Sequence, residues 1–387
     1  MLGWELPPYN SGGLGVACYH LAKALAEHGA DIQFVLPSTA DHDDVEFMRV
    51  LKPRGTTKRT VYTSNPNPYT GDLTTIRELQ AEYEDFVEKL IAIERPDVVH
   101  AHDWLTLRAG MRAKAVSGVP LIAHVHATEF DRAGGDYGDP LIHEIEEHGL
   151  LMADHVVAVS NATKQLITKR YNIPSDKIEV IHNSAELLDS HTTDISAYRY
   201  IERLKHEDYT VVATIGRLTR QKGLTHFLRA AAQAHSRYSR FLFVIAGSGE
   251  QRDELIELSA DLGIADAVIF TGFVRGQALR DIYNLADVFV MSSVSEPFGL
   301  TALEAAQHRT ALSITNQSGV REVLNGTLTY DYWDENRLAD QLVALALSEP
   351  LRDQLAHDAG LEVMQLSWKK VAAQFVDRYS VLRRVQA

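Results

Sequence analysis

The sequence predicts an α/β protein made of two doubly wound parallel-sheet domains, each Rossmann-like, that face a cleft. Short apolar, β-branched runs alternate along the chain with stretches of helical periodicity, which is typical of parallel strands joined by helices. The alternation pauses near the middle of the chain and then restarts. With 387 residues and 45% apolar content, the chain is long enough for two domains that each have a core.

In the first half of the chain, a short first strand is expected before the loop that starts at Asn10. The next predicted strands are Asp31–Leu36, Asp97–His100, Pro120–Val125 and His155–Val159. The predicted helices are Leu14–His28, Thr75–Glu94, Leu105–Ser117 and Asn161–Tyr171. The strand runs are mostly apolar and short, as expected for strands that are buried on both faces.

In the second half, the alternation begins again after a polar, charged stretch. The predicted strands are Thr210–Ile215, Phe241–Ile245, Ala267–Phe270, Val288–Met291 and Ala311–Ile314. The helix after Gly223 has one apolar stripe with i, i+3, i+4 spacing, made by Leu224, Phe227, Leu228, Ala231 and Ala232. We therefore predict a first domain at 1–188, a linker at 189–208, a second domain at 209–366, and a C-terminal helix at 367–387 that packs back toward the first domain.

Composition excludes several classes of function. The chain has 52 acidic and 38 basic residues, a net charge of −14, which argues against nonspecific binding to nucleic acid or to an anionic membrane. Cys18 is the single cysteine, so no internal disulfide is possible. No apolar run approaches the ~20 residues of a membrane span, and the N-terminus lacks the features of a signal peptide. We expect a cytoplasmic protein.

Ligands of doubly wound sheets bind at the carboxyl ends of the strands, so the loops that follow strands are the candidate sites. The first such loop is Asn10–Gly15, which contains Gly12 and Gly13. Adjacent glycines before a helix allow backbone N–H groups to approach an anion, although glycine pairs are equally common in tight turns. The loop does not match the G-x-G-x-x-G dinucleotide fingerprint.

The second loop is Gly216–Gly223, which follows the strand Thr210–Ile215 and contains Arg217, Arg220 and Lys222. Cations at the end of a strand, beside a helix N-terminus, suit a diphosphate, because arginine pairs two phosphate oxygens and lysine acts as a point charge. In so acidic a protein we favour this interpretation over a solvated basic loop.

The third loop, Ser295–Glu304, follows the strand Val288–Met291. Glu296 lies in the loop, and Glu304 lies about one turn into a helix that begins near Gly299. The free backbone donors at the helix start suit a phosphate or a sugar hydroxyl, and two carboxylates suit sugar and ribose hydroxyls. An acid/base pair like that of a glycosidase, or two ordinary helix and surface charges, are the alternatives.

Two histidine pairs follow strands of the first domain, in His100-Ala101-His102 and His124-Val125-His126. Their spacing is compatible with a metal, but no cysteine accompanies them, and we interpret them as histidines that line a pocket. The D-x-D string Asp41-His42-Asp43 lies among further acidic residues and is interpreted as solvated charge. We predict no metal site and no cofactor.

Together and in this order, these motifs resemble retaining glycosyltransferases of family 4, which have the GT-B fold and include relatives of glycogen and sucrose synthases. The motif His-Ala-His-Asp-Trp is also typical of glycogen and starch synthases. The segments that carry the resemblance are Glu296-Pro297-Phe298-Gly299-Leu300 with Glu304, Gly216-Arg217 with Lys222-Gly223, Gly12-Gly13, His100-Ala101-His102-Asp103-Trp104, Val159-Ser160-Asn161 and His182-Asn183-Ser184.

The resemblance implies an acceptor-side first domain and a second domain that binds a nucleotide sugar. Arg217 and Lys222 would hold the donor diphosphate, Glu304 the ribose, and Glu296 the transferred sugar. His126 would lie beside the reacting sugar and its C6 hydroxyl. The implied catalytic residues are His126, Arg217, Lys222 and Glu296. The implied donor-binding residues are Gly12, Gly13, Gly216, Phe298, Gly299, Leu300, Thr301 and Glu304.

The implied reaction retains the anomeric configuration and proceeds on the front face, so that the departing phosphate oxygen takes the acceptor proton. Positioning and electrostatic stabilisation of the leaving group are then the protein's contribution, and two cations replace the divalent metal used elsewhere. The donor is expected to be UDP-glucose or ADP-glucose, and the acceptor is unknown, with a glycan as one candidate. A nucleotide-sugar epimerase and a catalytically impaired nucleotide-sugar-binding protein are the competing hypotheses.

The sequence departs from the family pattern at three places. The chain starts at Met-Leu-Gly-Trp, where relatives have more residues that complete the first strand, so we expect a shortened strand there. Ser318 stands at a position where relatives have the first glycine of a loop. Arg309 and Ala311 stand where they usually have glycine and proline. Since a helix must end abruptly before the strand Ala311–Ile314, we expect Arg309 to adopt a left-handed conformation.

Overall fold

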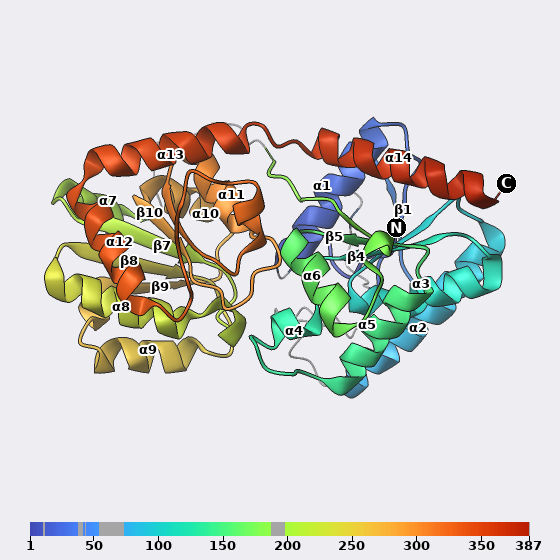
Figure 1. Cartoon of the computed structure of the whole chain (residues 1–387), viewed down its shortest axis with the longest axis horizontal. Helices are drawn as coiled ribbons and strands as arrows, with labels where there is room; N and C mark the ends of the chain where they lie inside the picture. Colours follow the sequence, from blue (N-terminus) through green and yellow to red (C-terminus); the bar gives the residue numbers. More distant parts are fainter. Residues whose placement is uncertain (11, 38–41, 43, 54–72, 187–197, 387) are drawn as a thin grey trace. The chain divides into compact units, whose positions relative to one another are not determined.

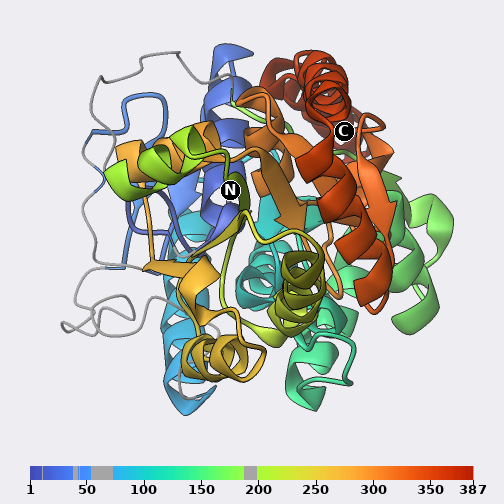
Figure 2. The same cartoon turned by 90° about the vertical axis from the view of Figure 1, so that its left-hand side faces the viewer.

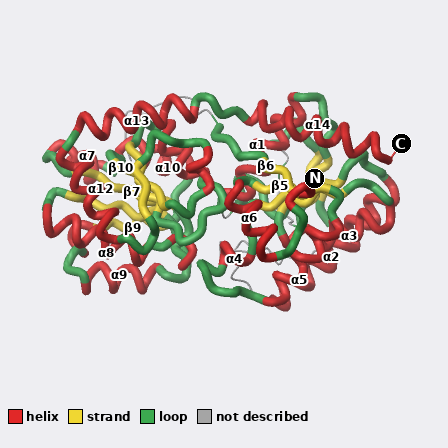
Figure 3. The backbone as a smooth tube through the Cα atoms, viewed as in Figure 1, coloured by secondary structure: helices red, strands yellow, loops and turns green. Residues whose placement is uncertain are grey.

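The computed structural model describes residues 1–10, 12–37, 42, 44–53, 73–186 and 198–386. Its contacts divide the chain into two compact units. Unit 1 comprises Met1–Phe130, Tyr137–Ser184 and Ser367–Ala387, and unit 2 comprises Asp131–Asp136 and Ala185–Leu366. In each unit the strands, all parallel, lie inside a layer of helices (Figures 1 and 3). The predicted fold class, α/β with two parallel sheets, is confirmed.

The sheet of unit 1 is joined through its N-terminal residues. Leu2 forms parallel bridges with both Val35 and Ala101, and its backbone N–H donates to the carbonyl of His100 at 2.7 Å. It thereby connects a two-stranded and a four-stranded sheet, so that the expected first strand is reduced to single bridges. The strands are β1 Gln33–Val35 and β2 Arg49–Leu51, then, in spatial order, β3 Val99–His102, β4 Leu121–Val125, β5 His155–Ala158 and β6 Ile178–Val180.

Helices pack around this sheet and against one another, and several of them contribute buried apolar residues to its core. They are α1 Gly13–Glu27, α2 Leu73–Ile93, α3 Trp104–Ser117, α5 Pro140–Met152, α6 Asn161–Arg170 and α14 Trp368–Gln386, with the short α4 Glu129–Arg132 and the 3-10 turn η1 Ser175–Lys177. Ser160 begins α6 as an N-cap, since its Oγ accepts from the backbone N–H of Thr163 at 3.1 Å. The C-terminal α14 packs against α1 within the same unit.

Unit 2 has one six-stranded parallel sheet in the order β12-β11-β10-β7-β8-β9. The first strand, β7, is central, so the chain winds outward from it in both directions, as in a Rossmann-like fold. The strands are β7 Thr210–Ile215, β8 Phe241–Ala246, β9 Val268–Gly272, β10 Val288–Met291, β11 Ala311–Thr315 and β12 Leu328–Tyr330.

Side chains of these strands alternate between two apolar clusters, one on each face of the sheet. Val212, Phe243 and Ile245 pack with the helices α8 and α12, whereas Val211 and Val244 pack with α7 and α10. Helices therefore cover both faces (Figures 1 and 2). They are α7 Arg199–His206, α8 Leu224–Arg237, α9 Arg252–Asp261, α10 Gly276–Leu285, α11 Leu300–Gln307, α12 Glu335–Leu347 and α13 Glu349–Val363, with 3-10 turns η2 Arg220–Lys222, η3 Ala265–Ala267 and η4 Gly319–Glu322.

Two of the predicted segments lie partly outside the residues that the structure describes. Of the linker expected at 189–208, residues 189–197 lie outside the described residues, and the following Arg199–His206 forms the helix α7. The polar composition of this helix concealed two buried residues, Ile201 and Leu204, which join a core cluster of unit 2. Asp41 and Asp43 of the D-x-D string also lie outside the described residues.

The end of α11 has the conformation expected from the sequence. Arg309 has a φ of 57°, in the left-handed region. Its N–H donates to the carbonyl of Ala306 at 3.1 Å, and the N–H of Thr310 donates to that of Ala305 at 3.2 Å. These two bonds define a Schellman motif with Arg309 at the position that glycine usually occupies. The residue is exposed, and within the described part of the chain no ion pair of its guanidinium is present.

We predict that Arg309→Gly stabilises unit 2 by about 1 kcal/mol. A side chain in the left-handed region costs roughly 1–2 kcal/mol, of which the greater flexibility of glycine in the unfolded chain cancels a part. Chemical denaturation measures the change, and Arg309→Ala is the control, because it removes the charge but keeps the Cβ and should resemble the wild type. Stabilisation by Arg309→Ala of the same size would show that charge, and not backbone strain, is responsible.

Candidate active site

The candidate site of unit 2 lies where the strand order reverses. β7 and β10 are neighbours, with Val288 beside Val212 and Phe289 beside Ala213, although the residues of each pair lie 76 positions apart in the chain. The loops that follow the carboxyl ends of these two strands therefore lie side by side. Residues that line the resulting hollow include Gly216, Arg217, Lys222, Ser293, Glu296 and Thr301.

Glycines allow these loops to approach one another closely. A Cβ on Gly223, which has a φ of 62°, would lie 2.1 Å from the carbonyl oxygen of Ser292. A Cβ on Gly247 would lie 1.8 Å from the carbonyl oxygen of Gly216. Both distances are impossible for a real side chain, so the loops after β7, β8 and β10 pack backbone to backbone at this point. Gly216 and Lys222 are thus held at the edge of the hollow.

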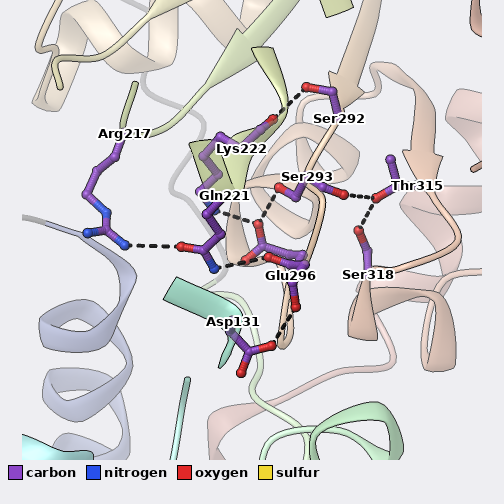
Figure 4. A network of polar contacts seen from close by, with 10 residues as sticks. Asp131, Arg217, Gln221, Lys222, Ser292, Ser293, Glu296, Thr315 and Ser318 are labelled. Carbon is purple, nitrogen blue, oxygen red and sulfur yellow. Dashed lines mark hydrogen bonds and ion pairs between the residues drawn. The ribbon is translucent and has the colours of Figure 1, made fainter. Parts of the chain in front are cut away.

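Lys222 and Glu296 form an ion pair in the hollow. Lys222 Nζ lies 2.5 Å from Glu296 Oε2, and Ser293 Oγ donates to the same oxygen at 2.9 Å (Figure 4). The side chains are 22% and 11% exposed, so the pair is well shielded while one side remains open to solvent. An ammonium group has three donors, so Lys222 keeps donors for an anion even while it binds Glu296.

A network of hydrogen bonds holds the loops around this pair (Figure 4). Gln221 Nε2 donates to the carbonyl of Ser295 at 3.0 Å, and its Oε1 accepts weakly from Arg217 at 3.5 Å. Ser295 Oγ donates to Asp131 Oδ1 at 2.5 Å. Asp131 belongs to the short segment Asp131–Asp136, which packs with unit 2. Arg217 and Lys222 therefore stand at opposite ends of a fixed turn.

The start of α11 supplies backbone donors. Gly299 is the N-cap residue with a φ of 118°, and Leu300 and Thr301 begin the helix. Phe298 is buried, and its carbonyl accepts from the N–H of Val320 at 2.7 Å, which ties this turn to the 3-10 turn η4. The first N–H groups of a helix have no intrahelical acceptor and favour an anion or a hydroxyl oxygen.

Glu304 lies one turn further along α11 and is partly buried. Its Oε2 accepts from the hydroxyl of Tyr283 at 2.6 Å. Burial raises the pKa of the Glu304 carboxyl, and the hydrogen bond from Tyr283 opposes this shift. Burial, together with the neighbouring carboxylate, raises the pKa of Tyr283, which is therefore the donor.

In unit 1, the predicted anion-binding loop leads into α1. Gly12 is the N-cap, in an extended conformation with a φ of −169°, and Gly13 is the first helical residue. A Cβ on Gly12 would meet no atom within 4 Å, so its space is open on that side. However, the buried carboxylate of Glu5 accepts from the N–H of Gly15 at 3.2 Å. One of the helix's free donors is thus already satisfied by the chain itself.

His126 follows β4 and belongs to a layer of four histidines. The backbone N–H groups of His126 and Ala127 both donate to Asp103 Oδ1, at 2.6 and 3.2 Å. Its Nε2 lies 3.1 Å from Nδ1 of His102, which leaves Nδ1 of His126 for another partner. Burial lowers the pKa of His126 to about 3, so its imidazole is neutral. Asp103, which has a φ of 58°, thus fixes the turn that carries His126.

The other three histidines are almost completely buried. His100 Nε2 lies 3.2 Å from His124 Nδ1, and the hydroxyl of Tyr379, on α14, lies 2.7 Å from His100 Nδ1. Burial lowers the pKa of His100, His102 and His124 well below the usual value. All four imidazoles are therefore neutral at physiological pH.

The ligand atoms of His100, His102 and His124 lie within 4.8 Å of one another, as do those of Cys18, His102 and His126. A shared metal ion must lie in the plane of every imidazole, about 2.0–2.1 Å from the nitrogen. The rings of His100 and His102 are stacked, with centroids 4.3 Å apart and planes inclined by only 24°. Stacked, nearly parallel rings direct their lone pairs along separate planes, which argues against one ion shared by His100 and His102, and both ring nitrogens of His100 already have partners. Cys18 joins His102 and His126 in the second group, although the sequence predicted no cysteine beside these histidines.

The predicted site residues are thus distributed over both units. Gly12, Gly13 and His126 lie in unit 1, whereas Arg217, Lys222, Glu296 and Glu304, together with Gly216 and Phe298–Thr301, lie in unit 2. Within unit 2 the structure brings Arg217, Lys222 and Glu296 to one hollow. The contributions of Asp103, Gln221, Ser293 and Tyr283 were not predicted. Asp103 and Gln221 lie in segments that were singled out in the sequence, but their roles depend on contacts with distant residues. Ser293 and Tyr283 belong to none of the motifs.

Comparison with known proteins identifies the family. Residues 11–187 match the model of Glycosyltransferase Family 4, and residues 199–360 match that of Glycosyl transferases group 1. The chain is 31% identical over 395 residues to an uncharacterized glycosyltransferase of Methanocaldococcus jannaschii, with 98% of this chain and 97% of the relative covered. It is 28% identical over 347 residues to a glycogen synthase of Mycobacterium tuberculosis, with 84% and 80% covered. The chain belongs to glycosyltransferase family 4.

Solved structures show the same fold. The sucrose-phosphate synthase of Thermosynechococcus elongatus matches with a TM-score of 0.79 at 19% identity, over 97% of this chain and 94% of that one. Anabaena HepE, solved in complex with UDP and glucose, matches with a TM-score of 0.75 at 17% identity, over 98% and 99%. The architecture is therefore that of the GT-B glycosyltransferases. Among the described helices, none is long and apolar enough to cross a membrane.

We predict that unit 1 loses stability steeply below about pH 6.5. The unfolded chain binds a proton at each histidine there, whereas the folded chain, in which their pKa values are lowered, does not. The free energy of unfolding should then decrease by about 1.4 kcal/mol per pH unit for each histidine. Denaturation followed by fluorescence of Trp4 and Trp104, both buried in unit 1, measures the slope.

His124→Leu should make this slope shallower by about one proton, that is by about 1.4 kcal/mol per pH unit. His148→Gln, at an exposed position on α5, is the control and should leave the slope unchanged. An unchanged slope in His124→Leu would mean that this histidine is protonated in the folded protein and that the layer is not neutral.

Proposed function

We propose that this chain is a retaining glycosyltransferase that transfers a hexose from a nucleoside-diphosphate sugar to an acceptor hydroxyl without a metal ion. The observation that carries the proposal is the position of Arg217 and Lys222 at the carboxyl end of β7, beside Glu296 and the free N-terminus of α11. In an acidic protein, this is a concentrated set of anion-binding donors at the strand-order reversal where such sheets bind nucleotides.

Each residue has a distinct part in the proposed reaction. Arg217 and Lys222 bind the donor diphosphate and stabilise the charge that develops on the leaving phosphate. Glu296 accepts hydrogen bonds from the hydroxyls of the transferred sugar, and the backbone N–H groups at the start of α11 bind the same part of the donor. Glu304 accepts from the ribose hydroxyls. Since no bond changes at a protein atom, the chain acts by positioning and electrostatics.

In the proposed reaction, the ion pair of Lys222 with Glu296 connects the diphosphate site with the sugar site. Lys222 retains two ammonium donors beyond the one it gives to Glu296 at 2.5 Å. A diphosphate that binds them adds negative charge beside the carboxylate, so Lys222 is attracted to both sides at once. It therefore links the leaving phosphate to the group that holds the sugar, and a displacement of either one affects the other.

In unit 1 we propose that His126 faces the reacting sugar. Its neutral imidazole hydrogen-bonds through Nε2 to His102, and its Nδ1 is offered to a substrate hydroxyl. Gly12, with open space on its Cα, belongs to the loop that we expect to approach the phosphates. A neutral histidine at this point positions the substrate without adding charge next to a transition state that is itself positively charged at the sugar.

We propose glucose as the sugar and UDP or ADP as the nucleotide. The glycogen synthase relative and the HepE structures solved with UDP and glucose or with UDP-glucose support glucose and a nucleoside diphosphate. An α-glucan is a candidate acceptor on the same ground. The relative from Rhodococcus opacus that acts on D-inositol 3-phosphate, 31% identical over 73% of this chain, indicates that the family also uses small phosphorylated acceptors.

A donor panel in excess EDTA tests this function. UDP-, ADP- and GDP-glucose, with the corresponding mannose and galactose donors, are incubated with glycogen, maltooligosaccharides and D-inositol 3-phosphate, and released nucleoside diphosphate is measured. We expect acceptor-dependent release that persists in EDTA, and a product whose anomeric configuration by NMR equals that of the donor. Restoration of lost activity by Mg²⁺ would contradict metal independence, and an inverted product would contradict retention.

Two other outcomes distinguish the competing hypotheses. Conversion of the nucleotide sugar to its epimer without any acceptor would identify an epimerase. Binding of nucleoside diphosphate with no turnover over the whole panel would identify a nucleotide-sugar-binding protein.

We predict that Arg217→Ala and Lys222→Ala each lower kcat/KM by ~30- to 1000-fold. A charge-assisted contact to phosphate in a shielded site contributes on the order of 2–4 kcal/mol in the transition state. Steady-state kinetics with the best donor measures the loss. Arg220→Ala is the matched control, because this side chain lies in the same loop but is 78% exposed and contacts Asp136 only at 3.9 Å.

Arg220→Ala should therefore stay within about threefold of the wild type. If kcat/KM of Arg217→Ala and of Lys222→Ala also stays within about threefold of the wild-type value, the diphosphate is bound elsewhere.

A further inference from the structure

Tyr283 is a buried side chain of α10 that contacts the proposed ribose-binding residue directly. It is 2% exposed, and its hydroxyl donates to Glu304 Oε2 at 2.6 Å. α10 and α11 are separate helices, so this hydrogen bond joins the proposed donor site to an element that contributes none of the predicted site residues. Glutamate has three rotatable side-chain bonds, and a carboxylate anchored at one oxygen has far fewer orientations than a free one.

The ring of Tyr283 is itself fixed from several sides. It stacks on the imidazole of His308, with centroids 5.3 Å apart and planes inclined by 15°. The ring of Phe289, on β10, lies 6.0 Å away. Thr310 Oγ1 donates to the backbone carbonyl of Tyr283 at 3.2 Å. The hydroxyl is therefore presented at a constant point, and it directs Glu304 rather than following it.

The contact leaves Glu304 able to bind a ligand. Each carboxylate oxygen accepts about two hydrogen bonds, and Tyr283 uses one position on Oε2. The remaining positions on Oε2 and both on Oε1 are sufficient for two vicinal hydroxyls. The bond also opposes the effect of burial, which raises the pKa of Glu304, and so favours the ionised form that accepts from hydroxyls.

We propose that Tyr283 is a positioning residue that holds the Glu304 carboxylate in the orientation in which it binds the ribose of the donor. This inference rests on the proposed function, because it takes Glu304 as the ribose-binding group. Its specific consequence is that the hydroxyl of Tyr283 contributes to nucleotide affinity although it does not touch the nucleotide.

The test compares Tyr283→Phe with Glu304→Ala and with Tyr330→Phe. Tyr330 is the matched control: it is 3% exposed in the same unit, and its hydroxyl donates to the backbone carbonyl of Met291 at 3.3 Å, not to Glu304. Binding of UDP and of ADP is measured by calorimetry, and melting temperatures establish that each variant is folded. The same titrations with 2′-deoxy- and 3′-deoxynucleotides report on the ribose contact itself.

Tyr283→Phe should weaken binding of the preferred nucleotide by about 3- to 10-fold. This is less than the full effect of a hydrogen bond to a charged group, because the hydroxyl acts on the nucleotide only through Glu304. It should raise the donor KM by a similar factor and leave kcat within about twofold. Removal of a ribose hydroxyl should weaken binding less in Tyr283→Phe than in the wild type. Tyr330→Phe should resemble the wild type in all three measurements.

The failures are distinguishable. If Glu304→Ala weakens nucleotide binding and Tyr283→Phe does not, the positioning role is wrong and the proposed function stands. If Glu304→Ala binds both nucleotides as tightly as the wild type, the ribose assignment within the proposed function is wrong, and the inference falls with it. Equal losses in Tyr283→Phe and Tyr330→Phe would show a general effect of removing a buried hydroxyl.

Discussion

The parallel pairing of β7 with β10 is the constraint on which the candidate site depends. These strands are the first and fourth of unit 2, and the sheet can bring them together only because the chain returns from its edge at β9 to the centre. At that return the two strands send their following helices to opposite faces, which opens a crevice between the loops. Lys222, from one loop, and Glu296, from the other, meet across it at 2.5 Å.

Backbone contacts keep this crevice narrow. At Gly223 and Gly247 a side chain would collide with a carbonyl oxygen of a neighbouring loop, so the loops are held at a separation that only glycine permits. The hydrogen bond from Ser292 Oγ to the carbonyl of Lys222, at 2.8 Å, adds to the same contact. A ligand that enters the hollow therefore meets groups whose positions are set before it binds, and pre-organised donors stabilise charge at little cost in reorganisation.

The sequence predicts those features of the fold and site that depend on residues close together in the chain. It does not predict those that depend on contacts between distant residues. Five strands of unit 2 were predicted because a parallel strand that is buried on both faces is apolar along its length, as in Phe241–Ala246. The edge strand β12, Leu328–Tyr330, was missed, since it has three residues and only one of them is buried. The left-handed Arg309 was predicted because the end of a helix is governed by local backbone geometry. The helix α7 was missed because only Ile201 and Leu204 of its eight residues are buried. Tyr283 was missed because its contact with Glu304 spans 21 residues and belongs to no motif.

In each unit, a carboxylate of the protein contacts one of the predicted anion-binding groups. Glu296 contacts Lys222 in unit 2, and Glu5 accepts from the N–H of Gly15 at the start of α1 in unit 1. An unpaired cation or N–H group in a shielded site is costly, so these carboxylates stabilise the folded chain around Lys222 and Gly15. They also lower the affinity for weakly charged anions, because such an anion gains little from donors that already have a hydrogen-bond partner. In the proposed function, a diphosphate carries enough charge, on several oxygens, to bind Lys222 and Arg217 together. The ion pair thus favours the chemical class of ligand that the strand-order reversal is shaped to bind.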